Sequence, residues 1–154
     1  MAEFIMKHLV SQAGRSSDFE IASAAVSTEE IGNDIYPPAK RMLSAKGVPF
    51  EQRAARQMTR ADYAYYDYIV CMDQSNLRWL NYIISDDTEH KVSLLMQWVD
   101  GELINGPYGE ADRSKRKEIV NRQIVNVADP WYTGDFTKAY DDILEGCQGM
   151  LQQL

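Results

Sequence analysis

The sequence has few of the residues from which metal sites and disulfide frameworks are built. It holds 2 cysteines and 2 histidines among 154 residues. Cys71 and Cys147 stand far apart, and neither has a Cys or His near it at the spacing of a metal motif. We therefore predict neither a metal site nor a disulfide, and we interpret both thiols as buried core residues.

Long apolar runs and clusters of basic residues are also missing. The longest apolar candidate, 92–99, is interrupted by Ser93 and Gln97 and falls short of the roughly 20 residues that span a membrane. The net charge is -7, and the one basic run, 113–117, is interpreted as a solvated helix face. Residues 1–10 lack the cleavage site of a signal peptide. These absences predict a cytoplasmic protein with no nucleic-acid or membrane partner.

The residues that are present can form one domain. Hydrophobic residues make up 45% of the chain, which is enough for a core in a protein of this length. We predict a single domain over residues 1–154. Its least regular part is the connection 100–127, which has glycines in its first half and a polar helical pattern at 111–123. We interpret this connection as a longer link or an insertion.

Helical and strand patterns alternate along the chain. Helices are predicted at 1–13, 37–46, 59–65, 76–84 and 136–154. Strands are predicted at 19–24, 66–72 and 92–98. Either Asp73 or Ser75 caps the helix at 76–84. This order predicts an α/β layer fold with a parallel sheet, in which ligands bind where loops leave the carboxyl ends of strands.

A carboxylate beside two aromatic rings stands near the C-terminus, in the run Asp129-Pro130-Trp131-Tyr132-Thr133-Gly134-Asp135-Phe136. Pro130 restricts Asp129 to extended geometry and Gly134 permits a second bend, so the loop presents its side chains to a cleft. A carboxylic acid against aromatic walls suits proton donation to a leaving group on a ring-bearing substrate. The alternative is a capped turn in which Asp135 starts the last helix and both rings pack on the core. These residues alone leave the two interpretations open.

The strongest functional signal lies in short stretches spread over nearly the whole chain. They are Met1-Ala2-Glu3, Ala22-Ser23-Ala24, Ala55-Arg56-Gln57-Met58-Thr59, Asp67-Tyr68-Ile69, Met72-Asp73, Ser75-Asn76-Leu77-Arg78 and the run from Asp129 to Phe136. Together they resemble the low-molecular-weight protein tyrosine phosphatases, and the stretches after Asp67 are specific to that family at their spacing. The resemblance implies a three-layer α/β fold with a central parallel sheet flanked by helices, and a phosphatase that needs no cofactor and no metal.

The resemblance also implies a set of functional residues. In the family, a Cys thiolate in a Cys-x5-Arg-Ser/Thr loop attacks phosphorus, the loop holds the phosphate oxygens, and an Asp protonates the leaving phenolate. Asp129 matches this general acid, and Trp131 and Tyr132 match the residues that flank the substrate ring. The supporting residues behind the phosphate loop would be Asp73, Ser75 and Asn76. The implied substrates are phosphotyrosine-containing proteins or small aryl phosphates.

The phosphate-binding loop itself is not in this sequence. Arg78 follows Cys71 one residue too late for a Cys-x5-Arg pattern, and no Arg follows Cys147. The family places the loop just before the stretch that matches Met1-Ala2-Glu3, and the helix at 1–13 has no N-cap residue in front of it. We therefore expect that the first strand and the phosphate loop are missing and that Met1 is an internal methionine. We expect residues 1–154 alone to be marginal or unstable as a monomer, and inactive.

Two single positions and one connection also differ from the common family pattern. Glu29 stands where many members have an aromatic residue, so it either disfavours acidic phosphopeptides or is simply solvent exposed, and we expect the second. Arg53 stands where some members have a histidine in a supporting network. The connection 100–127 is longer than the usual family link.

Three functions stay open at the level of sequence. The first is a phosphotyrosine phosphatase completed by an upstream Cys-x5-Arg segment. The second is a catalytically inactive, truncated relative that acts as a binding or regulatory module. The third, an arsenate reductase of the same fold, needs more cysteines for its redox relay than Cys71 and Cys147 provide. The oligomeric state and the physiological substrate do not follow from the sequence.

Overall fold

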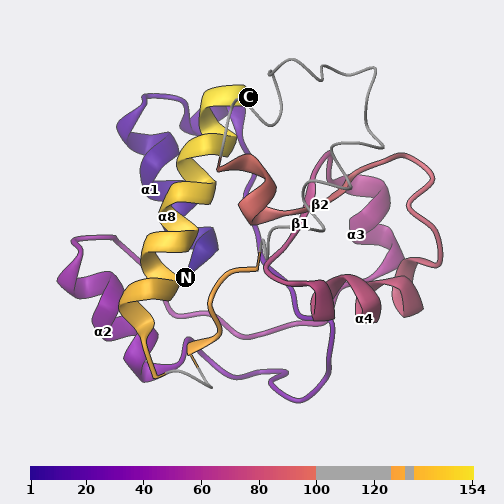
Figure 1. The fold of residues 1–154 in the computed structure, drawn as a ribbon, viewed down its shortest axis with the longest axis horizontal. Helices are drawn as coiled ribbons and strands as arrows, with labels where there is room; N and C mark the ends of the chain where they lie inside the picture. Colours follow the sequence, from indigo (N-terminus) through magenta and orange to yellow (C-terminus); the bar gives the residue numbers. More distant parts are fainter. Residues whose placement is uncertain (100–125, 131–133) are drawn as a thin grey trace.

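The computed structural model describes residues 1–99, 126–130 and 134–154. The predicted features outside these residues are the helix at 111–123, most of the connection 100–127, and the positions of Trp131 and Tyr132. Figure 1 shows the described elements arranged around a small central sheet.

Within the described part of the chain, the sheet has two strands, β1 (Ile69–Cys71) and β2 (Val92–Leu94). They pair in parallel, with Ile69 opposite Val92. The parallel sheet predicted from the sequence is therefore confirmed. Both strands are shorter than their predicted ranges.

The end of β2 is set by a side chain rather than by the apolar run. The Leu94 N–H donates a hydrogen bond to Oε1 of Gln97 (2.9 Å), and the chain turns into the 3-10 helix η2 (Leu95–Trp98). The indole N–H of Trp98 then donates to Oγ of Ser93 (3.1 Å). The predicted strand over 92–98 is wrong in its second half, because this local bonding replaces ladder hydrogen bonds.

The helices lie at the predicted places, although the one predicted at 76–84 begins two residues earlier, at Gln74. They are α1 (Ala2–Gln12), α2 (Pro37–Ala45), α3 (Arg60–Tyr65), α4 (Gln74–Ile84) and α8 (Phe136–Gln153), with a 3-10 turn η1 (Ser16–Asp18). α3 follows a capping box in which the Asp62 N–H donates to Oγ1 of Thr59 (3.2 Å) and the Thr59 N–H donates to Oδ2 of Asp62 (2.9 Å). The Asn76 N–H donates to Oδ1 of Asp73 (2.8 Å), so Asp73 rather than Ser75 caps α4.

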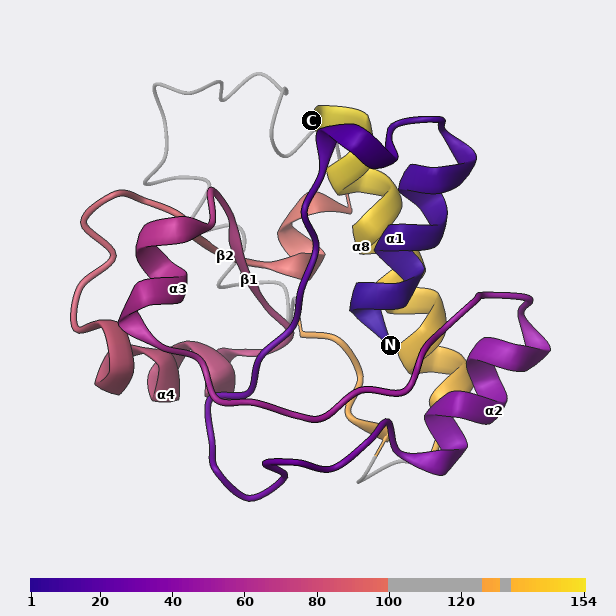
Figure 2. The same cartoon turned by 180° about the vertical axis from the view of Figure 1, so that it is seen from behind.

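Helices cover both faces of the sheet. α1 and α8 pack together on one face with α2 against α8, and α3 and α4 lie on the other face (Figures 1 and 2). One core surrounds Ile5 and Leu43 beneath α1 and α8, and a second core surrounds Leu80 between the sheet and α4. The predicted α/β fold with a parallel sheet flanked by helices is confirmed. No helix in the described residues is both long and apolar enough to cross a bilayer.

The segment 19–24 was predicted to be a strand, and this prediction is wrong. The chain is extended there, with Phe19 at φ -129° and ψ 137°, but its one pairing among the described residues is an isolated bridge at Ala25. The Ala25 N–H donates to the Arg56 carbonyl (2.7 Å), and the Met58 N–H donates to the Ala25 carbonyl (2.8 Å). An extended chain becomes a strand only when a backbone partner runs along it. On the side that faces β1, the described residues form a groove instead.

The last helix approaches η2 so closely that one position requires glycine. A Cβ at Gly149 would lie 1.8 Å from the carbonyl oxygen of Trp98 and 2.6 Å from its carbonyl carbon. Both are backbone atoms, which cannot rotate away. At Gly146, a Cβ would lie 2.6 Å from Cγ of Leu95. Small residues on this face of α8 therefore permit its contact with η2.

We expect Gly149→Ala to lower the melting temperature, although alanine is normally favoured in a helix by about 1 kcal/mol over glycine. The added Cβ forces α8 and η2 apart, and such overpacking typically costs about 1–3 kcal/mol. Thermal unfolding followed by circular dichroism measures the effect. Gln148→Ala, at an exposed position of the same helix, is the control. An unchanged or raised melting temperature for Gly149→Ala would contradict the close approach.

Candidate active site

The acid loop, residues 126–130, is anchored to the end of β1 and to the start of α4. The Val127 N–H donates to the carbonyl of Met72, the residue after β1 (2.9 Å). The Gln74 N–H in the first turn of α4 donates to Oδ1 of Asn126 (3.1 Å). These bonds place the acid loop at the carboxyl end of a parallel strand, where the alternation of helices and strands predicts a ligand site.

A third bond joins the acid loop to α8. The Ala128 N–H donates to Oδ2 of Asp142 (3.0 Å), and Nζ of Lys138 lies 3.4 Å from Oδ1 of the same carboxylate. Asp142 therefore fixes the backbone just before Asp129. The sequence interpretation missed Asp142 and Asn126. Asn and Asp often bond backbone N–H groups at turns, but their partners here are 14 and 52 residues away in the sequence.

A hollow of about 550 Å³ lies between the acid loop, the start of α4 and α8. It is lined by Asp129, Asp73 and Ser75, so the structure brings three of the predicted site residues together. The side chains of Arg78 and Lys138 add positive charge to its walls. No group of three or more His, Cys, Asp or Glu suited to a metal ion occurs among the described residues.

Asn76, the fourth predicted site residue in the described chain, folds the turn between β1 and α4. Its Oδ1 accepts hydrogen bonds from the N–H groups of Met72 (3.1 Å) and Asp73 (3.3 Å). The side chain lines the groove beside the sheet rather than the hollow at Asp129. Asn76 therefore acts on the hollow indirectly, by holding Asp73 in place.

Neither cysteine reaches the hollow. Both are free and buried, Cys71 in the core against α4 and Cys147 in the core beneath α1. Burial, helped by the nearby charge of Asp73, raises the pKa of Cys71 to about 11, and burial raises the pKa of Cys147 to about 12. The thiolate is the nucleophilic form, so both thiols are unreactive near neutral pH. Their interpretation as core residues is confirmed.

The two single positions that differ from the family pattern have different surroundings. Glu29 is exposed, as predicted. Arg53 forms an ion pair with Glu3 of α1, and its Nη2 donates to the Ser23 carbonyl (2.9 Å). Arg53 therefore ties the start of α1 to the extended segment 19–24.

The raised pKa of Cys147 makes stability depend on pH. The unfolded thiol ionises near its ordinary pKa of 9.0, whereas the folded thiol ionises at about 12. Stability from the protonated buried thiol is fully present below pH 9 and is lost as the pH rises toward 12. We expect the difference in unfolding free energy between the unmodified chain and Cys147→Ala to fall by about 1.4 kcal/mol per pH unit above pH 9. Urea unfolding at pH 8, 9 and 10 measures it, and a pH-independent difference would contradict the assignment.

We expect Asp142→Ala to loosen the acid loop, because the Ala128 N–H loses its acceptor. A lost hydrogen bond to a charged group is worth about 1.5–3 kcal/mol, so exchange of the Ala128 amide should accelerate more than about tenfold. Hydrogen exchange followed by NMR measures the rate. Asp142→Asn keeps an acceptor oxygen and is the matched control. If the rate in Asp142→Ala stays unchanged, the carboxylate does not hold the loop.

Fold and site together define the class: an α/β protein whose acid loop is held at the carboxyl end of a parallel strand beside a capped helix. The sequence profile described as "Low molecular weight phosphotyrosine protein phosphatase" matches residues 1–154. The chain belongs to this family, as its motifs predict.

Individual relatives agree with this assignment. The low molecular weight phosphotyrosine protein phosphatase of Rattus norvegicus is 32% identical over 155 residues, which cover 99% of this chain and 85% of the relative. The crystal structure of YfkJ from Bacillus subtilis matches with a TM-score of 0.79 at 24% identity, covering 99% of this chain and 83% of that one. SP-PTP, the low molecular weight protein tyrosine phosphatase from Streptococcus pyogenes, matches with a TM-score of 0.74 at 28% identity, covering 99% and 82%.

Proposed function

We propose that this chain supplies the acid-bearing part of a phosphotyrosine phosphatase, with Asp129 as the general acid. The observation that carries the proposal is the anchoring of the acid loop to β1, α4 and α8 beside the hollow. Asp73 and Ser75 line the same hollow. Family membership supports the reaction class, hydrolysis of a phosphate monoester. Residues 1–154 act as one domain in this proposal.

The reaction runs in two steps. A thiolate attacks phosphorus, the bond between phosphorus and the aryl oxygen breaks, and Asp129 gives its proton to the leaving phenolate. Water then attacks the cysteinyl-phosphate, Asp129 takes a proton from that water, and the thiolate and inorganic phosphate are released. Cys71 and Cys147 do not supply the thiolate, because burial keeps both protonated. It comes from a Cys-x5-Arg segment that is not among these 154 residues.

The substrates in this proposal are phosphotyrosine-containing proteins or small aryl phosphates. Trp131 and Tyr132 flank the ring of the substrate. Asp73, Ser75 and Asn76 support the phosphate-binding segment from behind. The hydrogen bonds from the Met72 and Asp73 N–H groups to Asn76 make this support rigid. The reaction requires neither a metal nor a cofactor.

One observation favours a second candidate, a catalytically inactive binding or regulatory module. The 154 residues contain no Cys-x5-Arg pattern, and both of their thiols are buried. The same burial disfavours an arsenate reductase, whose redox relay requires accessible thiols. The coding sequence directly upstream of Met1 separates the two candidates. An in-frame Cys-x5-Arg-Ser-Pro is the result expected for the phosphatase, whereas an in-frame stop codon leaves the binding module.

We expect Asp129→Asn, in the protein that carries the Cys-x5-Arg segment, to lower turnover of phenyl phosphate about a hundredfold or more while phosphate still binds. The loss should be smaller for para-nitrophenyl phosphate, because its phenolate leaves more readily without a proton. Steady-state kinetics on both substrates measure the ratio. Asp141→Asn, at an exposed position of α8, is the control. A change of less than threefold would remove Asp129 from the role, and residues 1–154 alone should show no hydrolysis above background.

A further inference from the structure

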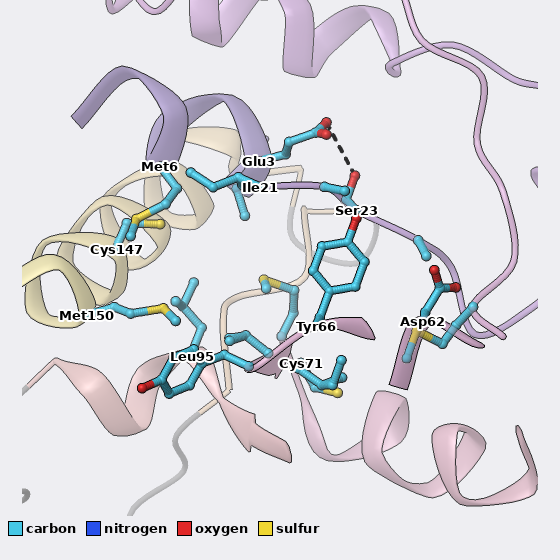
Figure 3. A pocket seen from close by; sticks show the side chains of 18 of the residues that line it. Glu3, Met6, Ile21, Ser23, Asp62, Tyr66, Cys71, Leu95, Cys147 and Met150 are labelled. Atoms are coloured by element: carbon cyan, nitrogen blue, oxygen red, sulfur yellow. Dashed lines mark hydrogen bonds between the residues drawn. The ribbon is translucent and has the colours of Figure 1, made fainter. Parts of the chain in front are cut away.

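Two exposed tyrosines outside α4 pack on other parts of the fold. Tyr68 packs edge-on against Trp98 of η2, with ring centroids 5.9 Å apart. Tyr65 packs edge-on against Tyr66 (5.0 Å), and its hydroxyl donates a hydrogen bond to Glu20. Figure 3 shows Tyr66 among the side chains that line a groove of about 1090 Å³ beside the sheet. Both exposed rings therefore have partners within the fold.

Trp79 and Tyr82 of α4 have no such support from other elements. They are 57% and 82% exposed, and their ring centroids lie 5.7 Å apart with an angle of 49° between the planes. Among the described residues, neither side chain has a hydrogen bond or a second ring contact. Residues three apart on a helix are neighbours, so the two rings form one exposed aromatic surface. Tryptophan and tyrosine are enriched among the residues that dominate binding energy at interfaces.

This aromatic surface continues the wall of the hollow beside Asp129. Ser75 and Arg78 line the hollow from the first half of α4. One face of the helix carries, at spacings of three and four residues, a set that we call the α4 strip: Ser75, Arg78, Trp79 and Tyr82. The helix rises about 10 Å from one end of the strip to the other, at about 1.5 Å per residue. About three residues of extended peptide cover that distance.

Arg78 gives the α4 strip a positive charge where it meets the hollow. Its side chain is exposed and forms no ion pair with any carboxylate of the described residues. The other cation at the hollow, Lys138, is paired with Asp142. The carboxylate of Asp73 caps α4 by accepting from a backbone N–H. Arg78 is therefore available to pair with a carboxylate that a ligand brings.

We propose that the α4 strip binds the segment next to the phosphotyrosine of a peptide substrate. It selects an acidic residue beside the phosphotyrosine, which pairs with Arg78, and an aromatic residue three positions away, which packs on Trp79 and Tyr82. This inference rests on the proposed function, because it takes the acid loop at Asp129 as the place where the phosphotyrosine lies. Since three extended residues span the strip, both contacts form in one bound peptide.

The test uses the same protein as the Asp129→Asn measurement. Its probe is the fluorescein-labelled peptide Phe-Gly-Glu-X-Glu-Gly-Phe-amide, where X is phosphonodifluoromethyl-phenylalanine, a phosphotyrosine analogue that cannot be hydrolysed. The peptide reads alike in both directions, so either chain direction presents both contacts. One control peptide has Gln in place of Glu, and a second has Ala in place of Phe. Fluorescence anisotropy measures the affinity of each peptide without any turnover.

Two substitutions and their matched controls test the two contacts separately. Arg78→Ala should weaken binding of the first peptide about threefold but leave the Gln peptide nearly unchanged. Trp79→Ala should weaken the first peptide about fivefold or more and the Ala peptide less than about twofold. Arg41→Ala and Tyr65→Ala, at exposed positions of α2 and α3, should change every affinity less than about twofold.

Three outcomes would overturn the proposal. The first is an equal loss of affinity for matched and control peptides, which would mean that the substitutions act on the fold. The second is binding of all three peptides with the same affinity by the unmodified protein. The third is a dimer by light scattering that Trp79→Ala converts to a monomer, since a second copy of the chain would then cover the strip.

The same protein separates this inference from the proposed function. Hydrolysis of phenyl phosphate together with any of these three outcomes keeps the phosphatase and removes the strip. Absence of that hydrolysis removes the phosphatase, whereas the peptide affinities still show whether Arg78 and Trp79 select the acidic and aromatic side chains.

Discussion

The docking of α8 on α1 and η2 is the contact on which the other features of this protein depend. Gly149 lets the helix approach the backbone of Trp98, and Ile143 and Cys147 bury against the core beneath α1. Once the helix is docked, Asp142 reaches the Ala128 N–H and fixes the acid loop. Packing at one end of α8 therefore determines the placement of a loop near its other end, because a helix transmits position along its rigid axis.

Burial divides the reactive groups of the described chain into two sets. The thiols of Cys71 and Cys147 lie in apolar cores that raise their pKa, so they contribute packing rather than chemistry. The carboxylates of Asp73 and Asp129 line a hollow instead. Asn76 holds the Asp73 backbone in place, so it acts on the hollow without lining it.

Local signals in the sequence predict much of the fold. The capping box at Thr59 and the cap at Asp73 start their helices through bonds that span three residues, which a short window of sequence contains. The two strand predictions that are wrong have different causes: at 92–98 a local bond to Gln97 ends β2 at Leu94, and at 19–24 the error depends on distant partners. Segment 19–24 has the alternation of a strand, but pairing is settled by what lies beside it in space. The motif around Asp129 predicts the acid loop, yet its tethers to Gln74 and Asp142 come from other elements.

The sequence by itself determined the family, the alternation of helices and strands, and the absence of a Cys-x5-Arg pattern, because each is written in residue identity and short spacing. Only the tertiary structure decided that Asp73, Ser75 and Asp129 line one hollow, and that Val70 and Ala24 line opposite sides of one groove. Those juxtapositions join residues far apart along the chain. They form only after burial of the apolar faces of α1, α4 and α8 has brought the segments together.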